Sequence, residues 1–194
     1  MRLEKYWVRG LIENELSVKI ENIVASIDGI SETFDLNRIF AEVSGTEYDK
    51  KKFPGLVYRV KDPKAAFLIF SSGKINCTGA RSLADVKRAC DILIEDLKKV
   101  GYIPIEPKII VQNVVASADL KAVINLNEVA GALLDDIEYE PEQFPGMVYR
   151  LRDMHIVVLI FGSGRLVITG AKDTESVYRA ARKVHEKLSS LGLI

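Results

Sequence analysis

Two long segments of this 194-residue chain occur twice, and each second copy begins 91 positions after the first. "ENIVASID" at Glu21–Asp28 returns as "QNVVASAD" at Gln112–Asp119. "FPGLVYRVKD" at Phe53–Asp62 returns as "FPGMVYRLRD" at Phe144–Asp153. Two copies are too few for a solenoid. We therefore expect a duplicated half-domain whose halves are related by an approximate two-fold axis.

The third repeated segment is a hairpin. "FLIFSSGKINCTG" at Phe67–Gly79 returns at the same spacing as "VLIFGSGRLVITG" at Val158–Gly170. The turns "SSGK" and "GSGR" favour Gly73 and Gly164 at positive φ. A phosphate-binding P-loop is excluded because a strand, not a helix, follows Lys74.

The same order of elements is expected in each half: a strand, a short helix, several strands and a long helix. Helical spacing of apolar residues predicts the long helices over about Ser82–Val100 and Asp173–Leu191. Ser82 and Asp85 fit a capping box at the first of them.

The strands of the repeated hairpin are apolar on both faces. Side chains alternate along a strand, so Phe67 and Ile69 share one face with Ile75 and Cys77 beyond the turn. Two helices per half can cover only one face. The apolar residues expected on the uncovered face are Leu68, Phe70, Leu159, Phe161 and Val167. A large exposed apolar face indicates a binding surface, unless the other half folds back to form a sandwich.

Composition narrows the function classes. The 27 basic and 27 acidic residues balance, which argues against a protein that coats nucleic acid by charge alone but leaves a local basic surface open. No apolar run is long enough for a membrane span, and the mixed charges at the N-terminus do not fit a signal peptide, so we expect a cytoplasmic protein.

His155 and His185 lack a third metal ligand, and no nucleophile motif is present, so we expect neither an enzyme nor a cofactor. Cys77 and Cys90 favour buried thiols, with a bridge between them left open.

The loops before the two FPG motifs carry opposite charges. The first contains Lys50, Lys51 and Lys52, whereas the second contains Glu138, Glu140 and Glu142. The basic loop suits phosphate and the acidic loop suits a basic protein partner.

Together these segments resemble the core domain of the TATA-box-binding protein family in its archaeal form, over about Val18–Leu191. The markers are "ENIVAS" and "QNVVAS", the two FPG motifs, "LIFSSGK" and "LIFGSGR", and the two "TGA" ends. The resemblance implies an α+β fold: a pseudo-two-fold saddle of one curved, continuous antiparallel sheet with helices on its convex face. It divides the chain into a variable leader (1–17), which includes Trp7, and two half-saddle repeats (18–101 and 108–194).

The resemblance also implies a function. The protein would be a general transcription initiation factor that binds the TATA box of double-stranded promoter DNA in the minor groove and kinks it by inserting phenylalanines. It would recruit transcription factor B and the RNA polymerase of the pre-initiation complex, without a cofactor and without contacting a membrane.

Carried over position by position, the resemblance assigns these roles. The wedges that enter the base stack are Phe53 with Phe70 and Phe144 with Phe161. The central hydrogen-bonding pair is Asn22 and Asn113. Leu68 and Leu159 lie beside these wedges. The residues that line the surface against the bases are Val24, Thr78, Val115, Val167 and Thr169, and Asn76 occupies a further position of that surface. The residues near phosphates are Arg59, Ser72, Lys74, Arg150, Ser163 and Arg165. The contacts to transcription factor B are Glu140, Glu142 and Gln143.

The residue types fit minor-groove recognition. An A·T pair shows only acceptors there, whereas a G·C pair adds an amino donor that Val, Leu and Thr cannot satisfy. Asn76 departs from the family pattern, which has an apolar residue at this place, and we expect Asn76→Val to keep or improve TATA affinity. The alternatives are a TATA-binding paralogue with altered selectivity, and a duplicated module that binds a small molecule or a protein through its apolar face.

Overall fold

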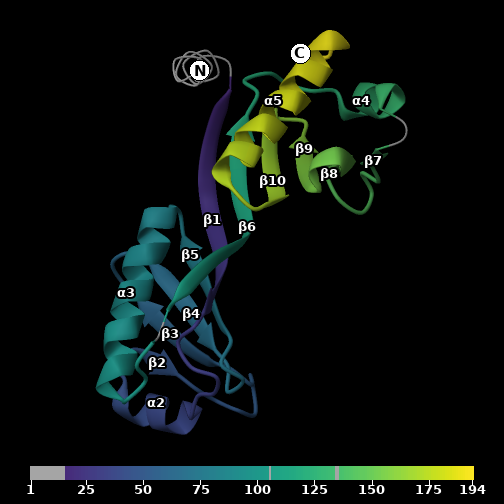
Figure 1. Cartoon of the computed structure of the whole chain (residues 1–194). Helices are drawn as coiled ribbons and strands as arrows, with labels where there is room; N and C mark the ends of the chain where they lie inside the picture. The colour runs from purple at the N-terminus through teal and green to yellow at the C-terminus, as the bar shows by residue number, and fades with distance from the viewer. Residues whose placement is uncertain (1–15, 105, 134–135) are drawn as a thin grey trace, which may run out of the picture. The chain divides into compact units, whose positions relative to one another are not determined.

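The computed structural model describes residues 16–104, 106–133 and 136–194 (Figure 1). All but the last two residues of the expected leader, Trp7 included, lie outside the described residues.

Both halves follow the element order that the sequence predicts. The first half consists of β1 (Ser17–Asp28), α2 (Leu36–Glu42), β2 (Thr46–Glu47), β3 (Leu56–Val60), β4 (Ala65–Ile69), β5 (Ile75–Ala80) and α3 (Leu83–Lys99). The second consists of β6 (Lys108–Asp119), α4 (Leu126–Ala132), β7 (Ile137–Glu138), β8 (Gly146–Leu151), the 3₁₀ turn η1 (Arg152–Met154), β9 (Ile156–Phe161), β10 (Arg165–Ala171) and α5 (Thr174–Ser190).

The strands form one ten-stranded antiparallel sheet in the order β2-β3-β4-β5-β1-β6-β10-β9-β8-β7. Two hydrogen bonds between side chains show that β1 and β6 run antiparallel. Ser117 on β6 donates to Glu21 on β1, and Gln112 on β6 donates to Ser26 on β1, so residue numbers rise along one strand as they fall along the other. A single antiparallel sheet with helices, built from two repeats, confirms the predicted α+β class.

Contacts between residues divide the chain into two compact units. One is the continuous segment Asn22–Asn113, and the other joins the described residues up to Glu21 to Val114–Ile194. Strands β1 and β6 therefore each contribute to both units. The two units are described separately below.

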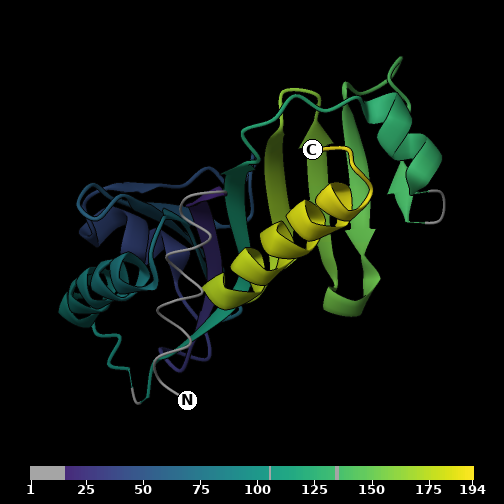
Figure 2. The same cartoon turned by 90° about the horizontal axis from the view of Figure 1, so that it is seen from above.

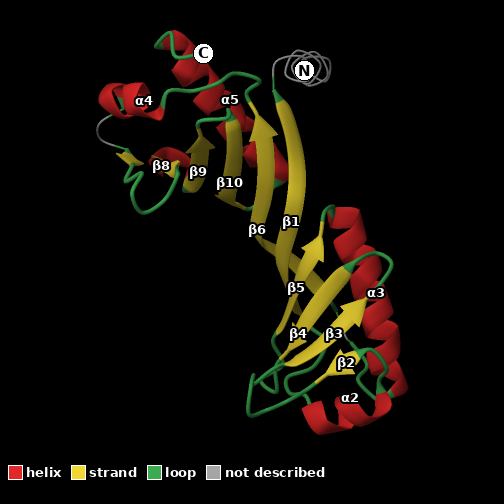
Figure 3. Ribbon diagram, turned by 180° about the vertical axis from the view of Figure 1, so that it is seen from behind, coloured by secondary structure: helices red, strands yellow, loops and turns green. Residues whose placement is uncertain are grey.

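In the unit of residues 22–113, α3 packs on β3, β4 and β5 (Figure 3). Its buried stripe consists of Val86, Ala89, Cys90, Leu93, Ile94 and Leu97. Tyr58 on β3 points toward α3, and its hydroxyl donates to Asp96 Oδ2 on that helix at 2.6 Å. Burial and this hydrogen bond to a carboxylate raise the pKa of Tyr58, so the phenol stays protonated and keeps donating.

In the other unit, α5 runs across one face of the strands and packs on β10 (Figure 2). Its buried residues are Val177, Ala180, Ala181, Val184 and Leu188, which recur at helical spacing. The sheet residues beneath, such as Val158, Ile160, Leu166 and Ile168, are fully buried. This face is the core of the unit.

Side-chain caps set where both long helices begin. The Asp85 N–H donates to Ser82 Oγ at 3.0 Å, which confirms the expected cap of α3. Asp173 caps α5 in the same way, accepting from the Ser176 N–H at 2.7 Å. The predicted helix ends are thus correct to within one residue at each terminus.

Both cysteines are buried free thiols, and no bridge joins them. Burial raises the pKa of Cys77 to about 12 and that of Cys90 to about 11. Neither thiol ionises near neutral pH, so neither is a nucleophile. Among the helices of the described residues, none combines the length and the apolar character needed to cross a membrane.

Candidate nucleic-acid interface

Within residues 22–113, the strand face opposite α3 is left without a helix over it. Along β4 and β5, buried residues alternate with half-buried or exposed ones, as the sequence pattern predicts. The residues on this uncovered face, which we call the first floor, are Asn22, Val24, Ser26, Val57, Arg59, Ala66, Leu68, Phe70, Asn76 and Thr78. Eight of the predicted site residues are thus on or beside one surface, because Phe53 packs against Phe70 at its edge.

The other unit has an equivalent face, opposite α5. This second floor consists of Val115, Ser117, Val148, Arg150, Val157, Leu159, Phe161, Val167 and Thr169. Phe144 packs against Phe161 as Phe53 does against Phe70. Asn113, two residues before Val115 on β6, is half-buried and belongs to the first unit.

The four expected wedge phenylalanines form two matching pairs. The ring centroids lie 5.9 Å apart in both, with interplanar angles of 65° for Phe53–Phe70 and 70° for Phe144–Phe161. Phe53 and Phe144 are each 38% exposed, unusual for large apolar side chains. Each unit therefore presents an edge-to-face aromatic pair at the rim of its floor.

A glycine lies beneath each aromatic pair. A Cβ atom at Gly55 would lie 2.8 Å from Phe53 Cε1 and 3.0 Å from Phe70 Cε1. At Gly146 it would lie 2.7 Å from Phe144 Cε1 and 2.9 Å from Phe161 Cε1. Because the glycine of each FPG motif has no Cβ atom, the two phenylalanine rings can pack directly against its backbone.

A tight turn precedes Phe53 and Phe144, the more exposed member of each phenylalanine pair. The Phe53 N–H donates to the Asp49 carbonyl at 2.9 Å, and the Phe144 N–H donates to the Glu140 carbonyl at 3.0 Å. The first turn carries the lysines and the second carries Glu142 and Gln143. The side chain of Gln143 donates to Glu140 Oε2, so two of the three expected partner-binding residues contact each other.

The amide of Asn22 is held in one orientation. The Gly79 N–H donates to Asn22 Oδ1 at 2.7 Å, and Asn22 Nδ2 lies 3.0 Å from Thr78 Oγ1. Because the Gly79 N–H and, at 3.3 Å, the Thr78 hydroxyl both donate to the amide oxygen, the amide can offer a bound ligand only its remaining N–H donor. The minor-groove edge of an A·T pair has only acceptors, so this orientation suits it.

Arginines stand at the outer edge of both floors, and each has a carboxylate partner. Arg59 Nε lies 3.1 Å from Glu47 Oε1, and an Arg150 guanidinium nitrogen lies 2.9 Å from Glu138 Oε1. Both pairs are exposed, and such ion pairs are weak enough for a phosphate to compete with the carboxylate. A pocket beside Arg59 is also lined by Lys61 and Lys64, which adds positive charge at this edge.

The remaining basic and serine positions lie at the hairpin turns. Lys74 and Arg165 precede Asn76 and Val167 by two residues, and both are exposed. Ser72 and Ser163 lie within the turns themselves and are exposed. The turn glycines have the predicted positive φ, 82° at Gly73 and 81° at Gly164.

Sequence reasoning missed several floor residues. Ser26, Val57 and Ala66, with their counterparts Ser117, Val148 and Val157, lie on the floors through cross-strand register. A signal was present, because Val57 and Val148 precede the predicted Arg59 and Arg150 by two positions. The pairing of those arginines with Glu47 and Glu138 depends on two-residue edge strands, which are too short to show a periodic pattern.

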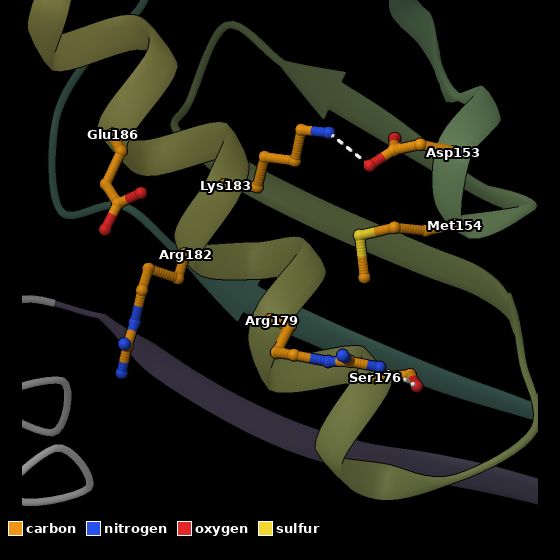
Figure 4. A pocket seen from close by; sticks show the side chains of 7 residues that line it. All are labelled: Asp153, Met154, Ser176, Arg179, Arg182, Lys183 and Glu186. Carbon is orange, nitrogen blue, oxygen red and sulfur yellow. Dashed lines mark hydrogen bonds and ion pairs between the residues drawn. The ribbon is translucent and has the colours of Figure 1, made fainter.

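In the second unit, a surface pocket that shares no residue with the floor lies between η1 and α5 (Figure 4). Its lining includes Arg179 and Arg182, and Lys183 Nζ lies 2.7 Å from Asp153 Oδ2 across it. None of the predicted site residues lines it.

Comparisons with known proteins agree with this geometry. A family described as transcription factor TFIID, or TATA-binding protein, matches residues 17–100 and 108–191. The TATA-box-binding protein of Methanothrix thermoacetophila is 54% identical over 183 residues, which cover 93% of this chain and 100% of the relative. That of Archaeoglobus fulgidus is 52% identical over 182 residues, covering 93% and 99%. The solved structure of Methanococcus jannaschii TBP superposes with a TM-score of 0.81 at 46% identity, covering 90% of this chain and 99% of that one.

Proposed function

Because this chain belongs to the TATA-binding protein family, whose members are general transcription factors and not enzymes, we propose that its two floors bind A·T-rich promoter DNA in the minor groove. The observation that carries the proposal is the duplicated uncovered face, which in both units ends in a partly exposed phenylalanine pair over a glycine. An apolar face of this kind needs a ligand, and its polar groups fit the acceptors of a minor groove.

The proposed binding has a favourable energy balance. Removing four phenylalanines from water contributes roughly 1.5–3 kcal/mol each. Unstacking a base step costs about a few kcal/mol. Burial of the two aromatic pairs can therefore offset two kinks, with additional stabilisation from phosphate contacts at Arg59, Arg150, Lys74 and Arg165. A zero net charge is no obstacle, because these four basic residues lie at the edges and turns of the floors.

The first prediction tests DNA selectivity. In a mobility-shift assay at fixed salt, a TATA duplex should bind at least a hundredfold tighter than a duplex of equal length with G·C substituted throughout, because the valine, leucine and threonine side chains of the floors cannot satisfy the guanine amino groups. The control is an unrelated A·T-poor duplex of the same charge. Equal binding to both test duplexes would overturn the proposal and favour a small-molecule or protein ligand for the apolar faces.

We also propose that the acidic turn before Phe144 recruits transcription factor B, and that the DNA complex then recruits RNA polymerase in the cytoplasm. Glu140, Glu142 and Gln143 are all exposed, and they surround the turn that holds a wedge phenylalanine. A partner bound there would contact this protein directly beside the DNA.

Charge reversal tests this surface. Glu140→Lys with Glu142→Lys should leave binding to the TATA duplex within about threefold but abolish the ternary complex, because the basic partner would meet like charge. A matched control makes the same change of charge at Asp91 and Glu95, which are exposed on α3. A normal ternary complex with the Glu140/Glu142 variant in a supershift assay would show that the partner binds elsewhere.

A further inference from the structure

The two floors differ in chemistry at the centre of one cross-strand row. In the first floor the row is Val57, Leu68, Asn76 and Ser26. In the second floor it is Val148, Leu159, Val167 and Ser117. The row is otherwise conserved between the repeats in residue type, so Asn76 introduces an exposed amide where the other unit has a valine.

The amide of Asn76 is open on both of its polar ends. Within the described part of the chain, the structure records no hydrogen bond to the Asn76 side chain. Its cross-strand neighbour Ser26 is engaged instead by Gln112, whose Nε2 donates to Ser26 Oγ at 3.0 Å. Asn22 differs, because the Gly79 N–H occupies its oxygen. Asn76 can therefore offer a ligand an acceptor as well as a donor.

An open amide and a valine select different base pairs. The minor-groove edge of A·T presents only acceptors, which leave an amide oxygen without a partner. The edge of G·C adds the guanine N2 amino group, which that oxygen can accept from while the amide N–H donates to a neighbouring base acceptor. A valine buries the same amino group without a hydrogen bond, which is costly.

On the basis of the proposed minor-groove function, we propose that Asn76 is a specificity-determining residue that accepts a G·C pair at the one base step it covers. The ligand is then an A·T-rich element with a single favoured guanine in one half, opposite the first floor. Val167 excludes guanine at the equivalent step of the other half. The two floors thereby distinguish the ends of a nearly two-fold symmetric DNA element, without help from a protein partner.

Inosine provides the test, because an I·C pair lacks only the minor-groove amino group of G·C. The probe set is a TATA duplex with G·C placed at each position in turn, and the same set with I·C. The wild-type protein should bind G·C at least fivefold tighter than I·C at one position, in one half of the element. Asn76→Val should reverse this preference at that position.

Val167→Asn is the matched gain-of-function variant and should create a G·C preference at the symmetry-related position. Both substitutions place a residue that the equivalent site of the other repeat already holds, and thermal melting confirms that each variant folds. A wild-type preference for I·C at every position, or no change in Asn76→Val, would overturn the role of Asn76. Failure of the wild-type protein to bind the all-A·T duplex would instead overturn the proposed function itself.

Discussion

Alanine at both Gly55 and Gly146 should abolish DNA bending while the protein remains folded. The added Cβ atoms would lie 2.7–3.0 Å from ring carbons of the two phenylalanine pairs, so the rings must move. The rings can move, because their outer members are 38% exposed and rotate about flexible side-chain bonds. The free energy of unfolding should change by less than about 1 kcal/mol. The displaced phenylalanine rings, however, would no longer be positioned to insert between the base pairs.

The measurement is energy transfer between dyes at the two ends of a TATA duplex, alongside the dissociation constant. We expect the bound duplex to stay close to straight and the affinity to fall about tenfold, which is about 1.4 kcal/mol. Gly131→Ala is the control, since no described atom beyond its chain neighbours and the backbone of its own helix lies within 4 Å of the site of its Cβ. Wild-type bending by the double variant would mean that the position of the rings does not depend on the space above these glycines.

Gly164→Ala should cause the largest loss of stability among glycine-to-alanine substitutions in the second unit. Gly164 has φ 81°, and a Cβ there would lie 2.0 Å from the carbonyl oxygen of Ala122. That atom belongs to the backbone and cannot swing aside. The Gly164 carbonyl also accepts from the Leu120 N–H at 3.0 Å, which ties the hairpin turn to the segment after β6.

The expected cost combines about 1–2 kcal/mol for a left-handed alanine with about 0.5–1.5 kcal/mol for a strained or lost hydrogen bond, and displacement of the backbone adds to both. Thermal unfolding should show a decrease in Tm of roughly 6–12 °C for a total of about 3 kcal/mol. Gly131→Ala, in helix α4, again provides the comparison and should be neutral or stabilising by up to about 1 kcal/mol. A Tm within 2 °C of wild type would contradict the clash.

Much of the architecture could be predicted from the repeat and from alternation. A period of two assigned Leu68 and Phe70 to one face and Phe67 and Ile69 to the other, and burial confirms this. The long helices followed from apolar spacing and from the Ser82 cap. These features depend on residues close together in the sequence, where local geometry decides the outcome.

Other features depend on contacts between distant segments and could not be predicted. The space above Gly55 matters only because Phe70, fifteen positions away, packs over it. The hydrogen bond from Gln112 to Ser26 requires the register of β1 against β6. The pairing of Arg59 with Glu47 requires an edge strand of two residues, too short to leave a period in the sequence.

The division of β1 and β6 between the two units has a consequence for synthesis on the ribosome. Residues 22–113 form a continuous segment, so every part of that unit is synthesised before residue 114 is added. The Ser26–Gln112 hydrogen bond holds the two ends of the segment together. Once folded, the early unit therefore brings its flanking residues close, and Glu21 lies near the place where Ser117 binds it once Ser117 has left the ribosome. Folding of residues 22–113 has then already offset the entropic cost of closing this loop. The late unit can therefore fold directly against the first residues of β1.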